Sequence, residues 1–289
     1  MKQLSVIVPH YNQPEKLKVL LDSIPQTASL EVIVIDDHSD SSSREAFNSL
    51  SQSYKWVTFL TVPDGEKGPG MARNLGIKMS SASWVLFADS DDYFVDNAFE
   101  IVDSYLESDA DVVYFSPDSL FTDTHKSASR HVQFRKLVDD YVDTQDKDVF
   151  LKHYSPCSKL VSKRILTAND IRFDPGVGGE DVNFGLKLAY YSKKVLADQR
   201  VIYMITDSEN SLTKKMSYTV LKNHFDGMCR YNDFLQLKDL NEHQAPMTGW
   251  VVRALSHSPV IMFKWLSMCI RKGYPFGLLF YVKKYLKKS

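Results

Sequence analysis

The sequence predicts an α/β protein with a mostly parallel, doubly wound sheet and helices on both of its faces. Short apolar runs alternate with segments of helical periodicity, which is typical of βαβ units. Several runs are apolar almost throughout, as in strands buried on both faces. The 289 residues include 44% hydrophobic and 25% charged side chains, which is an ordinary composition for a globular enzyme.

Five strands are predicted, and helical patterns separate most of them. The strands are Leu4 to Val8, Val32 to Ile35, Val57 to Val62, Trp84 to Ala88 and Val112 to Phe115. Pro14 suits the first turn of a helix after the first strand. Residues 118–148 are polar and weakly periodic, so we expect a surface excursion that could shape an acceptor site. A C-terminal helical extension is expected from Met216 onward.

Polar clusters follow three of the predicted strands. They are Pro9-His10-Tyr11-Asn12, Asp36 to Asp40 and Asp89 to Asp92. In open α/β sheets, ligands bind in the crevice beyond the carboxyl ends of the strands. The clusters therefore indicate a binding site at one edge of the sheet, although each cluster alone is also compatible with a turn or a helix cap.

The cluster after the fourth strand indicates a cation. If the chain stays extended, Asp89 and Asp91 point to the same side. Two such carboxylates repel each other unless a cation lies between them or one is protonated. Hard oxygen ligands suit Mg²⁺ or Mn²⁺, and Mg²⁺ is often held by one or two carboxylates together with substrate phosphates. The alternative is an acidic turn that caps the next helix.

Two further segments carry candidate functional residues. Gly68-Pro69-Gly70 opens a helix near Met71, and Arg73 lies one turn into it, where a cation is unfavourable unless an anion is expected nearby. Glu180-Asp181 precedes another helical pattern. Acidic residues at a helix start are usually caps, so a structural role stays open for this pair.

Five motifs occur in order: Val-Ile-Val-Pro-His-Tyr-Asn (6–12), Val-Ile-Asp-Asp-His-Ser (34–39), Gly-Pro-Gly-Met-Ala-Arg-Asn (68–74), Ala-Asp-Ser-Asp-Asp (88–92) and Gly-Gly-Glu-Asp (178–181). In order and spacing they resemble the family 2 inverting, nucleotide-sugar-dependent glycosyltransferases with the GT-A fold. The resemblance covers residues 1–212, which we expect to be the catalytic domain. Residues 213–289 are expected to be a helical, basic C-terminal region.

The resemblance implies a role for each matching residue. Asp181 would be the general base, with Glu180 beside it. Asp91, with Asp89, would hold the Mn²⁺ or Mg²⁺ ion that bridges the donor diphosphate. The donor would contact the residues of the first four motifs, namely Pro9, His10, Tyr11, Asn12, Asp36, Asp37, Gly70, Arg73, Asp89 and Ser90. Either Asp36 or Asp37 would read the base, and Asp37 is favoured. Cys157 stands near a position that often holds Trp in the family, so the acceptor-side wall is expected to differ.

The function implied is transfer of a sugar, expected from a UDP-sugar, to a saccharide or lipid-linked saccharide in bacterial surface polysaccharide synthesis. The alternatives are a sugar-nucleotide nucleotidyltransferase and an inactive nucleotide-binding scaffold. The former would be expected to carry a basic Gly-rich signature where this chain has Pro9-His10-Tyr11-Asn12.

The C-terminal region has a one-sided charge. None of the 36 acidic residues lies after Glu242, whereas eight of the 35 basic residues do. Residues 277–288 are amphipathic, with lysines on one side, which suits an anionic membrane surface; a helix packed on the catalytic domain is the alternative. No nucleic-acid module is recognised. No signal peptide or transmembrane run is evident, and three scattered cysteines suit a reducing compartment, so we expect a cytoplasmic or peripheral membrane protein.

Overall fold

A computed structural model of the chain describes residues 2–207 and 216–277. Its strands are β1 (Leu4–His10), β2 (Leu30–Asp36), β3 (Val57–Thr61), β4 (Trp84–Phe87), β5 (Tyr93–Phe94), β6 (Val112–Phe121), β7 (Lys159–Ser162) and β8 (Val195–Asp207). They form one sheet in the order β3-β2-β1-β4-β7-β6-β8-β5. β7 runs antiparallel to β4 and β6, and β5 runs antiparallel to β8, while the other neighbours are parallel. The predicted α/β class is confirmed, with a mixed sheet.

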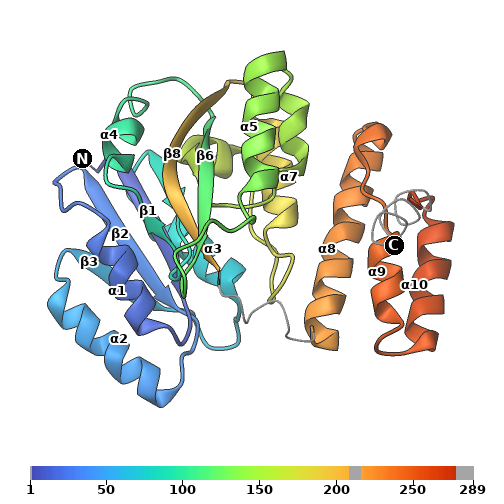
Figure 1. The fold of residues 1–289 in the computed structure, drawn as a ribbon, viewed down its shortest axis with the longest axis horizontal. Helices are drawn as coiled ribbons and strands as arrows, with labels where there is room; N and C mark the ends of the chain where they lie inside the picture. Colours follow the sequence, from blue (N-terminus) through green and yellow to red (C-terminus); the bar gives the residue numbers. More distant parts are fainter. Residues whose placement is uncertain (1, 208–215, 278–289) are drawn as a thin grey trace.

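Helices cover both faces of this sheet (Figure 1). The α-helices of this part are α1 (Pro14–Asp22), α2 (Ser41–Ser53), α3 (Pro69–Met79), α4 (Ala98–Asp103), α5 (Val132–Thr144), α6 (Lys163–Ala168) and α7 (Val182–Tyr191), with a 3-10 helix η1 (Lys147–Lys152). Pro14 and Pro69 stand in the first turns of α1 and α3. Proline is favoured there because an N–H in the first turn has no acceptor within the helix, so the absence of the proline N–H costs no hydrogen bond.

Alternate residues of the central strands pack into two hydrophobic cores, one on each face of the sheet. Val6 and Val8 of β1 pack in one core with α1, α2 and α4. Ile7 packs in the other with α3, α5, α6 and α7. The central strands are therefore buried on both faces, as their almost wholly apolar runs predict.

Residues 118–148 are more regular than predicted. β6 continues to Phe121, and α5 follows, so the expectation of a surface excursion was wrong for much of this segment. β6 gains its length by parallel pairing with β8 from Val112 to Phe121. Backbone pairing of this kind tolerates polar side chains, and Ser116 and Ser119 lie buried in β6. α5 buries only Phe134 and Val138, which explains its weak periodicity.

The C-terminal region is helical, as predicted. It contains α8 (Tyr218–Leu237), α9 (Thr248–Ala254) and α10 (Pro259–Arg271), with a short 3-10 helix η3 (Asn241–His243). These helices share a third hydrophobic cluster. Tyr231 and Leu235 of α8 also belong to the core that contains α7, so α8 connects the two parts. The predicted boundary at residue 212, and the amphipathic segment beyond Gly277, lie outside the described residues.

Candidate active site

A cavity of about 710 Å³ lies at the carboxyl ends of β1, β2 and β4. The register places His10 beside Asp36, so these strands end together. The cavity is lined by residues from all three predicted polar clusters, from the loop before α3 and the start of that helix, and from more distant segments that supply Arg130, Val177 and Glu180. They are Pro9, His10, Tyr11, Gln13, Asp37, Lys67, Pro69, Arg73, Asp89, Ser90, Asp91, Asp92, Arg130, Val177 and Glu180. Asn12, Asp36 and Gly70 do not line this cavity.

The two acidic residues after β2 have different surroundings. Asp36 is buried and pairs with His10 Nδ1 at 2.9 Å, and it accepts hydrogen bonds from the backbone N–H and hydroxyl of Ser39. Burial opposes ionisation, yet these hydrogen bonds hold the pKa of the Asp36 carboxyl below its usual value. Asn12 also bonds within this layer, to Ser39 and Asp40. Asp36 and Asn12 therefore stabilise the strand ends and loops next to the cavity without lining it.

Asp37 faces the cavity and anchors the glycine-rich loop. Both of its carboxylate oxygens accept the backbone N–H of Gly68, at 2.9 Å each. Burial raises the pKa of Asp37. Gly70 lies behind the loop, where an added Cβ would stand 2.4 Å from the carbonyl oxygen of Asp174. Gly70 therefore permits close packing of α3 on the segment that leads to Glu180.

Asp89 to Asp92 form a turn, so the extended geometry assumed for this segment was wrong. The N–H of Asp92 donates to the carbonyl of Asp89 at 3.1 Å. β8 holds the turn from the side: the hydroxyl of Tyr203 accepts the N–H of Asp89 at 2.8 Å, and Asp92 accepts the N–H of Thr206 at 2.7 Å. Asp92 is buried, whereas the side chains of Asp89 and Asp91 are 37% and 35% exposed.

Arg73 is the buried cation of this site. Its guanidinium donates to Asp89 at 2.5 Å and to Glu180 at 3.3 Å, and it lies 5.2 Å from the ring centroid of Phe173. Burial alone would lower the pKa of Arg73, but the charges of Asp89 and Glu180 raise it. These partners account for a cation at the start of α3, and they tie three distant segments together.

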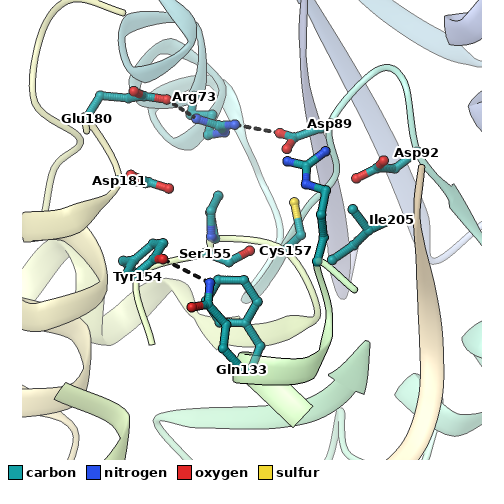
Figure 2. A pocket seen from close by; sticks show the side chains of 13 residues that line it. Arg73, Asp89, Asp92, Gln133, Tyr154, Ser155, Cys157, Glu180, Asp181 and Ile205 are labelled. Atoms are coloured by element: carbon teal, nitrogen blue, oxygen red, sulfur yellow. Dashed lines mark hydrogen bonds and ion pairs between the residues drawn. The ribbon is translucent and has the colours of Figure 1, made fainter. Parts of the chain in front are cut away.

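A second cavity of about 350 Å³ adjoins the first (Figure 2). The two share five residues of their walls: Arg73, Asp89, Asp92, Arg130 and Glu180. The second cavity adds Asp181 on one side and Cys157 and Ile205 on the other, with Tyr154 and Gln133 below them in the view of Figure 2. Asp37, Asp91 and Asp181 therefore lie along one continuous, two-part cleft.

Asp181 has an unusual environment for a carboxylate. It stands at the N-cap of α7, yet its side chain makes no cap hydrogen bond. No side chain in the described ranges is hydrogen-bonded or ion-paired with it, and its carboxylate points into the second cavity (Figure 2). Burial, and then the like charge of Glu180, raise the pKa of Asp181 to about 7. Glu180 by contrast is held by Arg73 and by the N–H of Gly178 at 3.0 Å.

Several lining residues were missed by the sequence analysis. Arg130 faces both cavities and donates to the carbonyl of Thr206 at 3.1 Å. Gln133 of α5 donates to the hydroxyl of Tyr154 at 2.9 Å, and both line the second cavity. Arg130 and Gln133 lie in residues 118–148, the segment expected to shape an acceptor site, but no motif singles out these residues or Tyr154. Cys157 was expected on the acceptor side, and it lines the second cavity.

A fully buried lysine lies at the start of β7, close in sequence to this wall. Lys159 Nζ donates to the carbonyl of His153 at 2.6 Å and lies 5.2 Å from the ring centroid of Tyr114. Burial lowers the pKa of Lys159 to about 7. Lys159 stands between Ser158 and the short apolar pair Leu160-Val161, so its sequence context gives little indication of full burial.

The carboxylates of Asp91 and Asp89 suit a divalent cation. Burial and the neighbouring charge of Asp89 raise the pKa of Asp91, although Arg73 pairs with Asp89 and Lys16 Nζ lies 3.9 Å from Asp91. In residues 2–207 and 216–277 no group of three or more His, Cys, Asp or Glu side chains is arranged to hold a metal ion. A two-carboxylate site that the donor phosphates complete is the arrangement common for Mg²⁺.

The family model "Glycosyl transferase family 2" matches residues 5–168 of this chain. The chain belongs to this family. The resemblance drawn from the five motifs is thereby confirmed at the level of the family. The match includes the turn that contains Asp89 and Asp91, while Glu180 and Asp181 lie beyond it.

Curated relatives include cell-surface polymer glycosyltransferases. The chain is 27% identical over 221 residues to the poly(ribitol-phosphate) β-N-acetylglucosaminyltransferase TarP of Staphylococcus aureus, covering 73% of this chain and 65% of the relative. It is 26% identical over 257 residues to the poly(ribitol-phosphate) β-glucosyltransferase of Bacillus spizizenii, covering 83% of this chain and 38% of that protein. The chain thus spans less than two thirds of either relative.

Solved structures share the fold. The structure of residues 1–349 of Staphylococcus aureus TarS with UDP-GlcNAc aligns with a TM-score of 0.66 at 21% identity, covering 89% of this chain and 74% of that one. A mannosyltransferase of Pyrobaculum calidifontis with GDP-Man and Mn²⁺ aligns with a TM-score of 0.53 at 16% identity, covering 99% and 81%. At these identities the likeness establishes the GT-A fold.

Among the described helices, every one is too short or too polar to cross a membrane.

Proposed function

We propose that this chain is a metal-dependent, inverting glycosyltransferase that takes its sugar from a UDP-sugar. One observation supports the proposal above the others: two cavities meet at a shared wall, and each offers the chemistry that one substrate needs. The larger contains Asp91, Asp89 and the loop before α3, which suit a nucleoside diphosphate. The smaller contains the unpaired carboxylate of Asp181, which suits an acceptor hydroxyl.

The reaction we propose is a single displacement. The acceptor hydroxyl oxygen attacks the anomeric carbon as its proton passes to Asp181, and the bond from that carbon to the diphosphate oxygen breaks. The nucleoside diphosphate leaves with the bonding electron pair. Attack from the face opposite the leaving group inverts the anomeric configuration. A divalent cation at Asp91 and Asp89 would offset the negative charge on the leaving phosphate when bound.

Arg73 and Glu180 have supporting roles in this proposal. Arg73 joins Asp89 on the donor side to Glu180 on the base side, so it fixes the distance between the two reactants. Such positioning supplies much of the rate in two-substrate reactions. Burial, and then the like charge of Glu180, keep the pKa of Asp181 high enough for that carboxylate to accept a proton near neutral pH. Arg130, which faces both cavities, is placed to meet the diphosphate.

Nucleotide binding is the direct test of the donor. Purified chain is screened by thermal shift with UDP, GDP and UDP-sugars, each with Mn²⁺ and with EDTA. A diphosphate present at 100 times its Kd should raise the Tm by about 4 °C, because it binds only the native state. The rise should require Mn²⁺. If no nucleoside diphosphate moves the Tm, the proposed donor site is wrong.

We further propose a saccharide-containing precursor of a bacterial surface polymer, lipid-linked at the cytoplasmic leaflet, as the acceptor. Relatives named for poly(ribitol-phosphate) substrates support a polymer acceptor. Exposed apolar residues on α10 support a membrane surface: Val260 is 76% exposed, and Phe263 and Ile270 are each 62% exposed. Lys264 and Arg271 are exposed on the same side by helical spacing. With no acidic residue after Glu242, this face suits anionic lipid.

Vesicle flotation tests the membrane proposal. The full chain should float with vesicles that contain phosphatidylglycerol and stay behind with pure phosphatidylcholine. Joint substitution of Phe263→Glu and Ile270→Glu should abolish flotation. Val19→Glu, at a 56% exposed position on α1, is the matched control and should float as wild type does. If the double variant floats as wild type does, this face of α10 does not bind the membrane. If the wild-type chain is a dimer that the double variant disrupts, the face is a dimer interface.

A further inference from the structure

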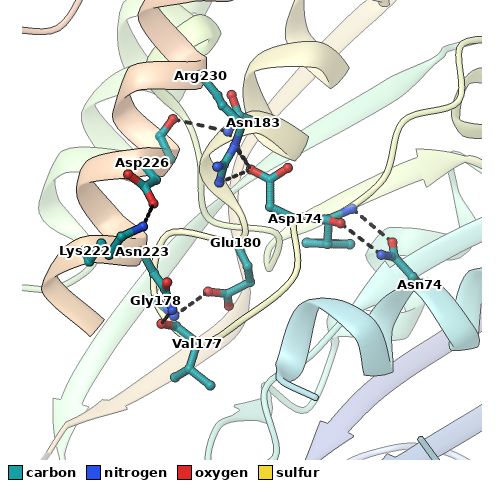
Figure 3. Close-up of polar contacts among 12 residues, drawn as sticks. Asn74, Asp174, Val177, Gly178, Glu180, Asn183, Lys222, Asn223, Asp226 and Arg230 are labelled. Atoms are coloured by element: carbon teal, nitrogen blue, oxygen red, sulfur yellow. Dashed lines mark hydrogen bonds and ion pairs between the residues drawn. The ribbon is translucent and has the colours of Figure 1, made fainter. Parts of the chain in front are cut away.

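The segment that carries Glu180 and Asp181 is packed between two helices from distant parts of the chain (Figure 3). On one side, Asn74 of α3 makes two hydrogen bonds with the backbone of Phe173, both of 3.0 Å. On the other side lies α8, which begins after the described catalytic core ends at Asp207. The segment has no regular structure from Phe173 to Asp181, so its position depends on these neighbours.

α8 contacts this segment through directed polar groups. Asn223 Nδ2 donates to the carbonyl of Val177 at 2.9 Å. Arg230 Nε donates to Asp174 at 3.0 Å, and Asn183 of α7 donates to the same carboxylate oxygen at 2.6 Å. Asn183 also reaches the carbonyl of Gly227 in α8 at 3.2 Å. Figure 3 shows these groups converging from α8 onto the loop before α7.

The packing between α8 and the loop leaves no spare room. Gly178 has a φ of +91°, and a Cβ added there would lie 2.9 Å from His224 Nε2 and 3.0 Å from Val220 of α8. The ring of His224 is stacked on Trp250 of α9, with centroids 5.2 Å apart. His224 is therefore supported from behind by the C-terminal region, and it limits the space available to Gly178.

The held loop reaches both reactants of the proposed reaction. Val177 lines the donor-side cavity, and the N–H of Gly178 donates to Glu180, whose other oxygen meets Arg73. Asp181 follows directly. A shift of the Val177 backbone would therefore disturb the donor wall and the neighbour that raises the pKa of the base.

We infer that α8 of the C-terminal region is a positioning element of the active site and that Asn223 is its main positioning residue. The C-terminal region is thus required for donor binding by the catalytic core, in addition to any role in membrane contact. The inference rests on the proposed function, because it concerns how the donor cavity and the base are held.

The test compares Asn223→Asp and Asn223→Ala with Lys222→Ala in the full chain. Aspartate keeps the size of asparagine but cannot donate to Val177, so folding should be preserved. Lys222 is the adjacent residue, and its ammonium pairs with Asp226 on the exposed side of α8. Loss of one neutral hydrogen bond changes an equilibrium constant by about fivefold. We expect the donor KM to rise about fivefold in both Asn223 variants and to be unchanged in Lys222→Ala.

Two measurements separate positioning from mere support of folding. A residue that only aided folding would reduce the active fraction, which lowers the apparent kcat and leaves the donor KM unchanged. Hydrogen exchange of the peptide covering residues 174–181 reports on the loop without activity, and it should become about fivefold faster in Asn223→Asp. An unchanged donor KM, or unchanged exchange, in both Asn223 variants of an active enzyme overturns the inference. A wild-type chain that binds no nucleotide and transfers no sugar overturns the proposed function instead.

Discussion

Asp181→Asn is the substitution whose effects the structure specifies most fully. The carboxyl has no hydrogen-bonded or ion-paired side chain among the described residues, so the change to an amide removes no side-chain contact. It does remove a charge that the native state disfavours. Burial and the charge of Glu180 move the pKa from 3.8 to about 7. We therefore expect Asp181→Asn to lose transfer activity and to gain stability.

The size of the gain follows from the shift in pKa. Each pKa unit corresponds to about 1.4 kcal/mol, so the full shift would be about 4 kcal/mol. Because the side chain borders a cavity that solvent can enter, we expect about half of this, roughly 2 kcal/mol. For a chain of this length that is a rise in Tm of about 3 °C at pH 8.

The pH dependence has a definite sign. The native state binds this proton more tightly than the unfolded state does, so wild type loses stability as the pH rises from about 4 to about 7. The stability advantage of Asp181→Asn should therefore be full at pH 8 and shrink towards pH 4. In wild type, kcat/KM should fall about tenfold per pH unit below about 7, because only the ionised carboxylate accepts the proton.

Thermal melts from pH 4 to pH 8, together with transfer assays, measure these effects. Asp96→Asn, at an exposed position, is the matched control and should change neither Tm nor transfer. Nucleotide binding by Asp181→Asn should equal that of wild type. If the Tm of Asp181→Asn at pH 8 equals that of Asp96→Asn, or if the variant still transfers sugar, the reasoning about the base is wrong.

The remaining predictions concern the cation, the acceptor and the backbone. Asp91→Ala should abolish the Mn²⁺-dependent part of UDP binding in calorimetry while the Tm without ligand falls by less than about 2 °C, because the side chain is 35% exposed; Mn²⁺-dependent binding as strong as in wild type would contradict this. Tyr154→Phe removes the hydroxyl that meets Gln133 and should raise the acceptor KM about fivefold, with the donor KM unchanged as the internal control; a change in the donor KM alone would place Tyr154 elsewhere in the reaction. Gly178→Ala should lower stability by about 1–3 kcal/mol in urea melts, because its φ is +91° and His224 occupies the space. Gly65→Ala, with a φ of +89° but no neighbour within 4 Å, is its control, and an equal loss in both would show that strain alone is responsible.

Sequence reasoning succeeded where the signal was local. Each central strand is an almost wholly apolar run, and this indicates burial on both faces without knowledge of the neighbours. The polar residues after β1, β2 and β4 meet because neighbouring parallel strands end at one edge of a sheet, which is a general property of the topology. The five ordered motifs predicted the family for the same reason, since each is a short local segment.

Reasoning from local pattern failed where partners come from afar. Asp36 and Asp37 are adjacent and identical in type, yet one bonds to His10 and Ser39 next to the cavity without lining it, while the other holds Gly68 at the cavity. The extended geometry assumed for Asp89 and Asp91 was wrong because Tyr203 and Thr206 of β8 stabilise a turn there. β8 was not predicted: its second half, Val201 to Thr206, is a strand-like run, but the polar residues Asp198 to Arg200 interrupt the pattern before it.

The sequence by itself determined the α/β class, the carboxylates at the strand ends and the family, because these depend on short segments whose side chains signal burial or chemistry directly. Only the tertiary structure decided that Arg73 joins Asp89 to Glu180, that Asp181 has a raised pKa and no side-chain partner within the described part of the chain, and that α8 holds the loop before it. Hydrogen bonds and desolvation act over a few ångströms in space, between residues as many as 115 positions apart in the chain, so they exist only once the chain has folded.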